Sequence, residues 1–206
     1  MSECGGSVAM CNPDDPLPLR SECSGNALPG IDIEIRDPET GETLAHGEPG
    51  EIVARGRGVF SGYYNDPEKT KAAFWEGGWF RTGDLGVLDV EGRVTFRGRL
   101  KDMLKVGGEN VAAVEIEGYL ALHPAVKLAQ VVSLPDEKYG EVPVAFVELI
   151  PGAAATEAEM IDFCLGDIAS FKVPRHVRFV EDWPMGATKI LKSALRERIL
   201  AEIAAA

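Results

Sequence analysis

Two patterns of hydrophobic and polar positions divide the sequence. Up to about residue 100, apolar residues recur at every second position in short runs, and Ile31–Arg36 (IDIEIR) is the clearest of them. A period of two is typical of a strand with one buried face. Glu51–Arg55, entered through Pro49-Gly50, is a second predicted strand, and Asp37–Gly41, which lies between the two, has the composition of a turn.

Residues 29–100 also carry a helix start and a hairpin. Asp66 followed by Pro67 is typical of a helix beginning, with Asp66 as the N-cap and Pro67 at the first helical position. Gly86–Asp89 and Arg93–Arg97 flank a short connection and predict a β-hairpin. Several short strands separated by turns favour a small barrel or sandwich.

Residues 1–28 show no periodicity. They are rich in Cys, Gly, Pro and Asp, which predicts loop structure. Because a domain seldom begins with such a stretch, we expect the chain to start inside a larger polypeptide.

Beyond residue 100, helical and strand patterns mix. Ala113–Leu122 has the spacing of a helix with one apolar face. Residues 193–205 predict a final helix whose apolar residues stand four positions apart. Strands are predicted at Val126–Leu134, Val142–Ile150 and Val177–Val180.

A capping box marks the start of one further helix. In Thr156–Glu159 (TEAE), the threonine hydroxyl and the glutamate carboxylate can satisfy backbone N–H groups at the helix start. The helix that follows is expected to place Ile161, Leu165 and Ile168 in the core, because they recur at helical spacing.

These patterns predict an α+β protein with a small β-barrel-like subdomain, then a hinge, then a compact α+β domain. The change of pattern places the boundary near Arg99–Asp102. Residues 1–100 would form the β-rich part, and residues 101–206 the mixed part.

Composition and charge narrow the class of protein. The 206 residues are 45% hydrophobic and 26% charged, as in an ordinary globular protein. The formal net charge of −12 disfavours nucleic-acid binding, which needs a basic face. There is neither an apolar run of the ~18 residues that a membrane span needs nor a signal-peptide pattern. We therefore expect a cytoplasmic protein.

The cysteines are scattered along the chain. Cys4, Cys11, Cys23 and Cys164 show no CxxC spacing. This favours free thiols over a zinc site.

The first candidate for chemistry is the segment Arg81–Asp84 (RTGD). Gly83 allows a tight turn or the close approach of a ligand, and the two oxygens of Asp84 suit two vicinal hydroxyls, as on a ribose. The alternative is a local turn or an ion pair between Asp84 and Arg81.

A glycine run, Gly56–Gly62, resembles a loosened dinucleotide-binding fingerprint, which would imply a nicotinamide-dependent oxidoreductase. That fingerprint needs a helix that opens on its last glycine. Because Tyr63–Pro67 intervenes here, a strand with bends at glycine is the better interpretation.

Two lysines stand in glycine-containing settings. Lys105 precedes the pair Gly107-Gly108, which admits a close ligand or a sharp turn. Lys189 follows a Pro/Gly loop, and its ammonium could neutralise charge that develops in phosphoryl or acyl transfer. Taken singly, either lysine is also compatible with a solvated surface position.

The order of the motifs is more specific than any single one. Along the chain they closely resemble the adenylate-forming family, whose members include acyl-CoA synthetases, firefly luciferase and the adenylation domains of peptide synthetases. The resemblance covers nearly the whole chain. The segments that carry it are Gly50–Tyr64, Trp79–Leu85, Gly98–Val111, Val114–Glu117 and Pro184–Lys192.

The resemblance implies a nucleotide site in the first half. Asp84 is similar to the family aspartate that holds the ribose hydroxyls, and Arg99 to the arginine that assists at ribose and phosphate. Residues 1–3 resemble the end of the family motif Tyr-Gly-x-Thr/Ser-Glu, so Ser2 would face the α-phosphate and Glu3 would hold Mg²⁺. The phosphate loop and the acyl pocket would lie upstream, in a missing N-terminal large domain.

The resemblance also implies roles for residues in the second half. Lys101 falls at the position of the hinge about which the small domain rotates. Lys105 matches the face presented for thioester formation. Gly107 and Gly108 would line the CoA site.

Lys189 is similar to the family lysine that bridges the acyl carboxylate and the α-phosphate, although Thr188 stands where many members carry glycine. The implied activity is that of an ATP-dependent acid–CoA ligase, which activates a small carboxylic acid as acyl-AMP and transfers it to CoA. Its cofactors would be ATP, Mg²⁺ and CoA. We expect the fragment alone to be inactive. The alternative is a non-catalytic remnant or interaction domain.

Overall fold

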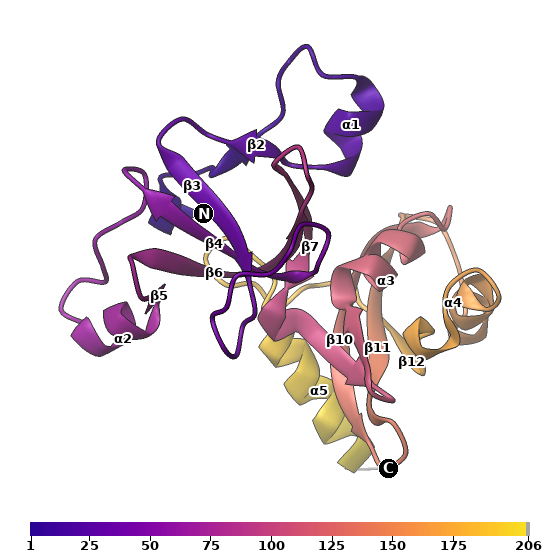
Figure 1. Ribbon diagram of the computed structural model, residues 1–206. Helices are drawn as coiled ribbons and strands as arrows, with labels where there is room; N and C mark the ends of the chain where they lie inside the picture. Colours follow the sequence, from indigo (N-terminus) through magenta and orange to yellow (C-terminus); the bar gives the residue numbers. More distant parts are fainter. Residues whose placement is uncertain (205–206) are drawn as a thin grey trace. The chain divides into compact units, whose positions relative to one another are not determined.

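The computed structural model describes residues 1–204. The chain divides into two compact units, Met1–Lys101 and Asp102–Ala206, which we call unit 1 and unit 2. Each combines strands and helices (Figure 1), which confirms the predicted α+β class. No helix within residues 1–204 has both the length and the apolar character that crossing a bilayer requires.

Unit 1 is built on a curled antiparallel sheet (Figure 1). Its strand order is β1-β2-β7-β6-β4-β3, and β5 pairs with β6. The strands are β1 (Ala9–Met10), β2 (Gly25–Ala27), β3 (Ile31–Arg36), β4 (Gly50–Gly56), β5 (Phe74–Trp75), β6 (Trp79–Leu88) and β7 (Arg93–Arg99). The predicted strands Ile31–Arg36 and Glu51–Arg55 are thus β3 and β4, and the predicted hairpin is β6–β7.

The helices of unit 1 are short. They are η1 (Ser2–Cys4), α1 (Leu17–Glu22) and α2 (Pro67–Ala72). The predicted cap of α2 is confirmed, because the Asp66 carboxylate accepts a hydrogen bond from Lys69 N at 3.0 Å. The loop predicted for residues 1–28 is wrong in part, since this stretch contains η1, β1, α1 and β2. Strands of two and three residues are too short to show a period.

The core of unit 1 lies around β4, which is buried from Gly50 to Ala54. Ala54 packs with Phe80 and Cys4, whereas Ile52 packs with other buried aliphatic residues. The ring of Phe80 meets that of Phe60 edge-on, with 5.2 Å between the ring centroids. This packing makes β4 a rigid base for the strand beside it, β6.

Unit 2 contains a second sheet with the order β10-β11-β8-β9, in which β12 pairs with β11. The β11–β12 pair is parallel and the other pairs are antiparallel. The strands are β8 (Met103–Val106), β9 (Glu109–Ala112), β10 (Val126–Asp136), β11 (Gly140–Leu149) and β12 (His176–Phe179). The helices are α3 (Ala113–Leu120), α4 (Glu157–Cys164), η3 (Ser170–Lys172) and α5 (Lys192–Ala204), and η2 (Leu100–Asp102) crosses the unit boundary.

Helices cover both faces of this second sheet (Figure 1). On β11, Ala145 and Val147 belong to the core that includes α3 and α4, whereas Val144 and Phe146 belong to the core that includes α5. Because successive residues of a strand point to opposite faces, a strand buried on both sides must be apolar throughout. This explains why apolar residues stand next to one another from Val144 to Val147 in β11.

The core positions of α4 differ from those predicted. The capping box is present, but the helix ends at Cys164, so that Leu165 and Ile168 lie beyond it. Met160 and Cys164 are the fully buried residues, and Ile161 and Ile168 are partly buried against the same core, while Leu165 is 55% exposed. The physical reason is that Gly166, at φ 89°, follows the helix and turns the chain away.

The last helix is confirmed over the described residues, and residue 205 lies outside them. Leu195 and Ile199 of α5 are buried against the sheet, but Ile203 is 42% exposed. The helix therefore extends past the edge of the apolar face that it covers.

We expect Ile199→Ala to lower the free energy of unfolding of unit 2 by about 2–5 kcal/mol, because it leaves a cavity between α5 and the sheet. Ile203→Ala is the matched control on the same helix and should cost less than about 1 kcal/mol. Urea unfolding followed by circular dichroism measures both. Equal costs would contradict the assignment of the buried face.

Candidate functional site

Asp84 lies on β6, next to an irregularity in the sheet. The β4–β6 ladder pairs Glu51 with Leu85 and then Val53 with Arg81, so the strand between them bulges away from regular pairing. Gly83 has φ 69°, in the left-handed region that favours glycine. A bulge of this kind redirects the side chains beside it, and here the redirected side chain is that of Asp84.

The buried side chain of Glu51 stabilises the bulge in β6. Its side chain is 1% exposed. One carboxylate oxygen accepts from Arg81 Nε at 3.1 Å, and the other accepts from Gly83 N at 3.1 Å. Both oxygens of a buried charge are thereby paired, which is the condition for keeping a carboxylate in a protein interior.

Thr82 completes the local network. Its hydroxyl donates to Ile52 O at 2.6 Å and accepts from Asp84 N at 3.0 Å. The guanidinium of Arg81 lies 4.3 Å from the ring centroid of Trp75. The backbone on either side of Asp84 is therefore fixed by hydrogen bonds to β4, the neighbouring strand.

Arg99 is the ionic partner of Asp84. The two residues face each other in register on β7 and β6, and Arg99 Nε lies 3.1 Å from Asp84 Oδ1. The aspartate side chain is 20% exposed and the arginine side chain is 41% exposed. The local ion pair considered for Asp84 and Arg81 is replaced, because Arg81 pairs with Glu51.

Ser2 and Glu3 form the short helix η1 at the start of unit 1. The Tyr63 hydroxyl donates to Glu3 Oε1 at 3.3 Å, and Phe60 N donates to Glu3 O at 2.7 Å. Burial and the Glu3 carboxylate raise the pKa of the Tyr63 phenol. These bonds fix the Glu3 backbone and one of its carboxylate oxygens.

Glu3 and Asp84 both act on one buried thiol. Burial raises the pKa of Cys4, the N-terminal ammonium lowers it, and the carboxylates of Glu3 and Asp84 raise it further. The fold of unit 1 thus brings these two carboxylates, which are far apart in sequence, within electrostatic range of the same group. No cluster of three potential metal-ligating His, Cys, Asp or Glu residues is present among residues 1–204.

In unit 2, Lys105 and the two glycines belong to one hairpin. Val106 pairs with Glu109, so Gly107 and Gly108 are the two connecting residues, at φ 60° and 90°. Two positive φ values in a two-residue hairpin loop are typical of a type I′ turn, which favours glycine. Lys105, Gly107 and Gly108 are all exposed, and an added Cβ on Gly108 would meet nothing within 4 Å.

Lys189 lies on a different loop of unit 2. Met185 and Ile190 form an isolated antiparallel bridge, and Gly186 N donates to Lys189 O at 2.7 Å. The lysine is exposed at the tip of this tight turn. Lys101 is also exposed, within η2 at the last position of unit 1.

Both ends of the Lys189 loop are anchored to the sheet and its helices. Before the loop, Trp183 Nε1 donates to Glu148 Oε2 at 2.7 Å. After it, Lys192 Nζ lies 2.6 Å from Glu117 Oε1. Lys127 and then Trp183 lower the pKa of Glu148, so the carboxylate that anchors the loop is ionised at neutral pH. The backbone of the short turn that carries Lys189 is therefore held in place on both sides.

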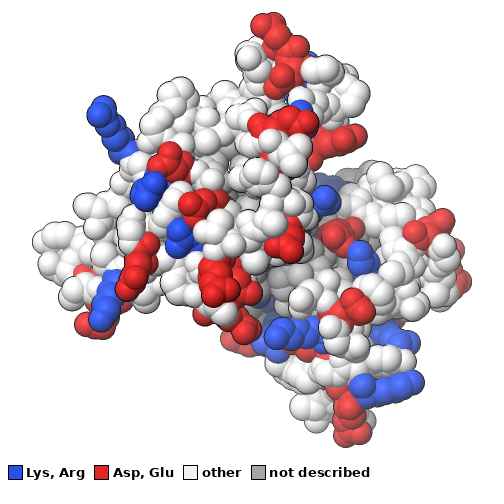
Figure 2. Space-filling view, in the orientation of Figure 1, with Lys and Arg blue, Asp and Glu red and all other residues white. Residues whose placement is uncertain are grey.

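A cavity of about 430 Å³ in unit 2 does not involve any predicted site residue. Glu115 and Lys172, which form an ion pair at 2.5 Å, contribute to its lining. The face shown in Figure 2 carries acidic side chains interspersed with basic ones.

Comparison with known proteins identifies the family to which the chain is related. Residues 1–64 match the AMP-binding enzyme family, and residues 115–189 match the AMP-binding enzyme C-terminal domain. The chain is 39% identical to medium-chain acyl-CoA ligase ACSF2 of Rattus norvegicus over 188 residues, which cover 91% of this chain and 31% of that protein. It is 39% identical to 4-coumarate–CoA ligase 1 of Solanum tuberosum over 206 residues, which cover 98% of this chain and 38% of that protein.

Among solved structures, the ATP-bound form of MatB from Rhodopseudomonas palustris is similar at a TM-score of 0.85 and 39% identity. The similarity covers 96% of this chain and 39% of MatB. The chain belongs to the adenylate-forming, AMP-binding enzymes. It spans between 31% and 39% of the length of these three relatives.

The two family matches of this AMP-binding chain leave the central residues outside them. Ser2 and Glu3 fall within the first match and Lys189 is the last residue of the second. Asp84, Arg99 and the Lys105 hairpin lie between the matched ranges. The roles considered for these residues are supported by the motifs and by the geometry described above.

Glu51 is the residue of the candidate site that sequence reasoning missed. The segment Glu51–Arg55 predicted a strand, and nothing in that prediction singled out Glu51 as a buried residue. A signal was nevertheless present in the sequence. Glu51 lies between Pro49-Gly50 and an apolar stretch, and the motif RTGD contains an arginine. The two side chains could therefore form a buried ion pair. Which arginine it meets depends on strand pairing.

We expect Glu51→Ala to lower the free energy of unfolding of unit 1 by about 2–4 kcal/mol, because it leaves Arg81 and Gly83 N without their acceptor. Asp32→Ala removes a solvent-exposed partner of Arg55 and should cost at most about 1 kcal/mol. Urea unfolding followed by tryptophan fluorescence compares the two. A cost for Glu51→Ala no larger than that of the control would show that the bulge does not depend on this carboxylate.

Proposed function

We propose that this chain is the C-terminal part of an ATP-dependent acid–CoA ligase. The enzyme would activate a carboxylic acid as acyl-AMP and transfer the acyl group to CoA. The observation that carries the proposal is the Asp84–Arg99 pair on a bulge fixed by Glu51. It supplies a fixed carboxylate for a sugar diol beside a cation for phosphate, in a chain similar to an ATP-bound enzyme.

In the first step, a carboxylate oxygen of the acid attacks the α-phosphorus of ATP and pyrophosphate leaves. Lys189 would stabilise the negative charge that gathers on the α-phosphate and the attacking carboxylate. Its exposed position on a turn whose backbone is held by a hydrogen bond supports this role, because the ammonium is accessible to a ligand. Ser2 would hydrogen-bond the same phosphate.

Glu3 fits a magnesium site of the kind that nucleotide enzymes use. Mg²⁺ is commonly held by one or two carboxylates together with substrate phosphates, rather than by a complete protein cage. A single carboxylate without a three-residue cluster in the described chain agrees with that pattern. The ion would supply positive charge to the ATP phosphates, and Tyr63 would hold the Glu3 carboxylate in place.

In the second step, the CoA thiol attacks the acyl carbon and AMP leaves. The type I′ turn at Gly107-Gly108 supports a role in this step, because a turn without side chains allows a narrow pantetheine chain to pass close to the backbone. Lys105, on the strand that leads into the turn, would contribute a cation at the same face.

The two steps need different groups at one acyl-phosphate centre. We propose that Lys101 is the hinge about which unit 2 changes its orientation between the steps. The residue falls at the boundary of the two units, in the short η2 segment rather than in a long helix or strand. Hinges often consist of such short, element-terminal segments.

The test of these roles is a graft. We replace the matching 39% of MatB with this chain and measure the two half-reactions separately. Lys189→Ala should slow acid-dependent pyrophosphate release by about 100-fold or more, yet leave the transfer of preformed acyl-AMP to CoA nearly unchanged. Gly108→Leu should have the opposite profile, because a side chain at this turn blocks the thiol path.

Lys71→Ala is the control for the graft, because Lys71 is an exposed cation on α2. It should change neither half-reaction. A Lys189→Ala variant that slows both half-reactions equally, or an unmutated graft without acid-dependent pyrophosphate release, would contradict the proposal.

We expect the 206-residue chain on its own to show negligible turnover, because it covers little more than a third of the length of its relatives. The assay is acid-dependent release of pyrophosphate from ATP, compared with the Lys189→Ala variant of the same chain. Release above that variant would show that the chain is a complete catalyst.

A further inference from the structure

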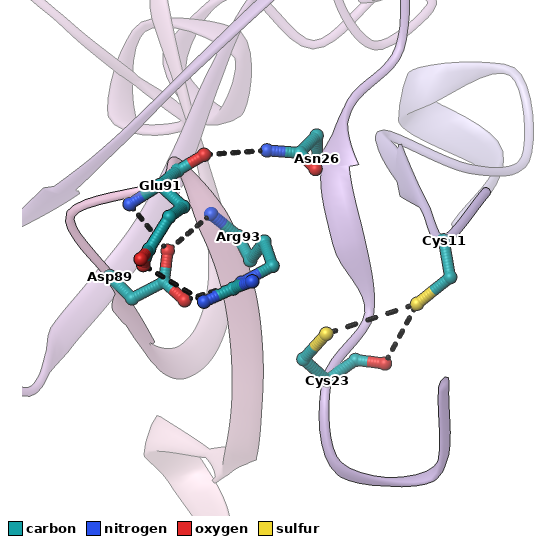
Figure 3. Close-up of polar contacts among 6 residues, drawn as sticks. All are labelled: Cys11, Cys23, Asn26, Asp89, Glu91 and Arg93. Carbon is teal, nitrogen blue, oxygen red and sulfur yellow. Dashed lines mark hydrogen bonds and ion pairs between the residues drawn. The ribbon is translucent and has the colours of Figure 1, made fainter. Parts of the chain in front are cut away.

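Two cysteines that have no part in the proposed reaction lie next to each other in unit 1. Their sulfur atoms, Cys11 Sγ and Cys23 Sγ, are 3.8 Å apart, and Cys11 Sγ is 3.4 Å from Cys23 O (Figure 3). The two residues are twelve positions apart in sequence. A disulfide has an S–S length of about 2.05 Å, so bonding needs only a small approach of two side chains that already point toward each other.

The backbone enforces this proximity. Cys11 directly follows β1, and Cys23 stands two positions before β2, so the thiols lie at one end of the antiparallel β1–β2 pair. At Gly25, which has φ 85°, an added Cβ would lie 2.1 Å from the Met10 carbonyl carbon. Only glycine permits so close an approach of the two segments.

The second segment is in turn fixed to the sheet. Ser24 N donates to Val94 O at 2.7 Å, and Asn26 Nδ2 donates to Glu91 O at 2.9 Å in the β6–β7 turn (Figure 3). That turn is braced by Arg93, whose Nε lies 2.6 Å from Asp89 Oδ2. The backbone at Cys23 is therefore held in place by the sheet. A bond from Cys23 to Cys11 would attach the edge strand β1 to it.

Access distinguishes this pair from the other two thiols. Cys11 and Cys23 are partly exposed, whereas Cys4 is 3% exposed and Cys164 is fully buried. Burial and the neighbouring Cys23 thiol raise the pKa of Cys11, and burial raises the pKa of Cys164 to about 11. Because the thiolate is the reactive form, reaction of Cys11 should become faster as the pH rises.

We propose that Cys11 and Cys23 are a redox modification site, at which a low-molecular-weight disulfide such as glutathione disulfide converts the two thiols into a reversible disulfide bond. The thiolate of one cysteine attacks a glutathione sulfur and releases one glutathione thiolate. The second thiolate attacks the mixed disulfide, forms the Cys11–Cys23 bond and releases the other glutathione. The two cysteines lose two electrons and two protons, and glutathione disulfide is reduced to two glutathione molecules.

The bond would close the segment that contains α1 and tie the two-residue strand β1 to the sheet. A cross-link stabilises a protein chiefly by restricting the unfolded chain. The effect should be confined to unit 1, because both cysteines and all their partners in this network belong to that unit.

The experiment equilibrates the 206-residue chain with glutathione disulfide and maps the products by mass spectrometry. We expect a Cys11–Cys23 cross-linked peptide, with a loss of two hydrogen atoms, as the main product. Dithiothreitol should reverse it. The thermal midpoint of unit 1 should rise by about 5 °C or more, and the midpoint of unit 2 should stay unchanged.

Single variants separate this reaction from general thiol oxidation. Cys11→Ser and Cys23→Ser should each stop at a stable glutathione adduct on the remaining cysteine, while Cys164→Ser should give the same cross-link yield as the unmodified chain. Stable adducts on both Cys11 and Cys23 of the unmodified chain, the absence of reaction at either, or a cross-link that involves Cys4 or Cys164 would overturn the proposal.

Discussion

The candidate nucleotide site depends on one buried carboxylate. Transfer of a charge from water into a protein interior is unfavourable unless hydrogen bonds and an opposite charge compensate for it. Glu51 meets this condition only while Arg81 and Gly83 N stay where the bulge of β6 places them. The same constraint fixes the backbone at Asp84 and its register with Arg99. A buried residue on the neighbouring strand thus determines where the candidate carboxylate points.

Unit 2 shows the complementary arrangement. Its sheet has an apolar core on each face, covered by helices, and the Lys189 and Gly107-Gly108 groups lie on loops outside these cores. The Lys189 turn is fixed by Trp183 and Lys192, and the glycine turn by the β8–β9 pair. Lys189 and the glycine turn therefore lie on two separate short loops of unit 2. Two separate loops are what the two steps of the proposed reaction would require.

Much of this could be predicted, because local patterns depend on neighbouring residues alone. The period of two predicted β3, Asp66 predicted the cap of α2, and Thr156 with Glu159 predicted the capping box of α4. One prediction failed because it depended on distant contacts, and another because a local backbone turn was overlooked. The strands β1 and β2 form only through pairing with each other and with β7, and α4 ends where Gly166 turns the chain.

By itself, the sequence determined the class of fold, the family and the residue types available for adenylation chemistry, because these follow from periodicity and from motifs of adjacent residues. Only the tertiary structure decided which charges meet. It paired Arg81 with Glu51 and Arg99 with Asp84, and it brought Cys11 to Cys23 without any CxxC spacing. The reason is that strand register sets these contacts, and register is fixed by the packing of the whole sheet rather than by any one segment.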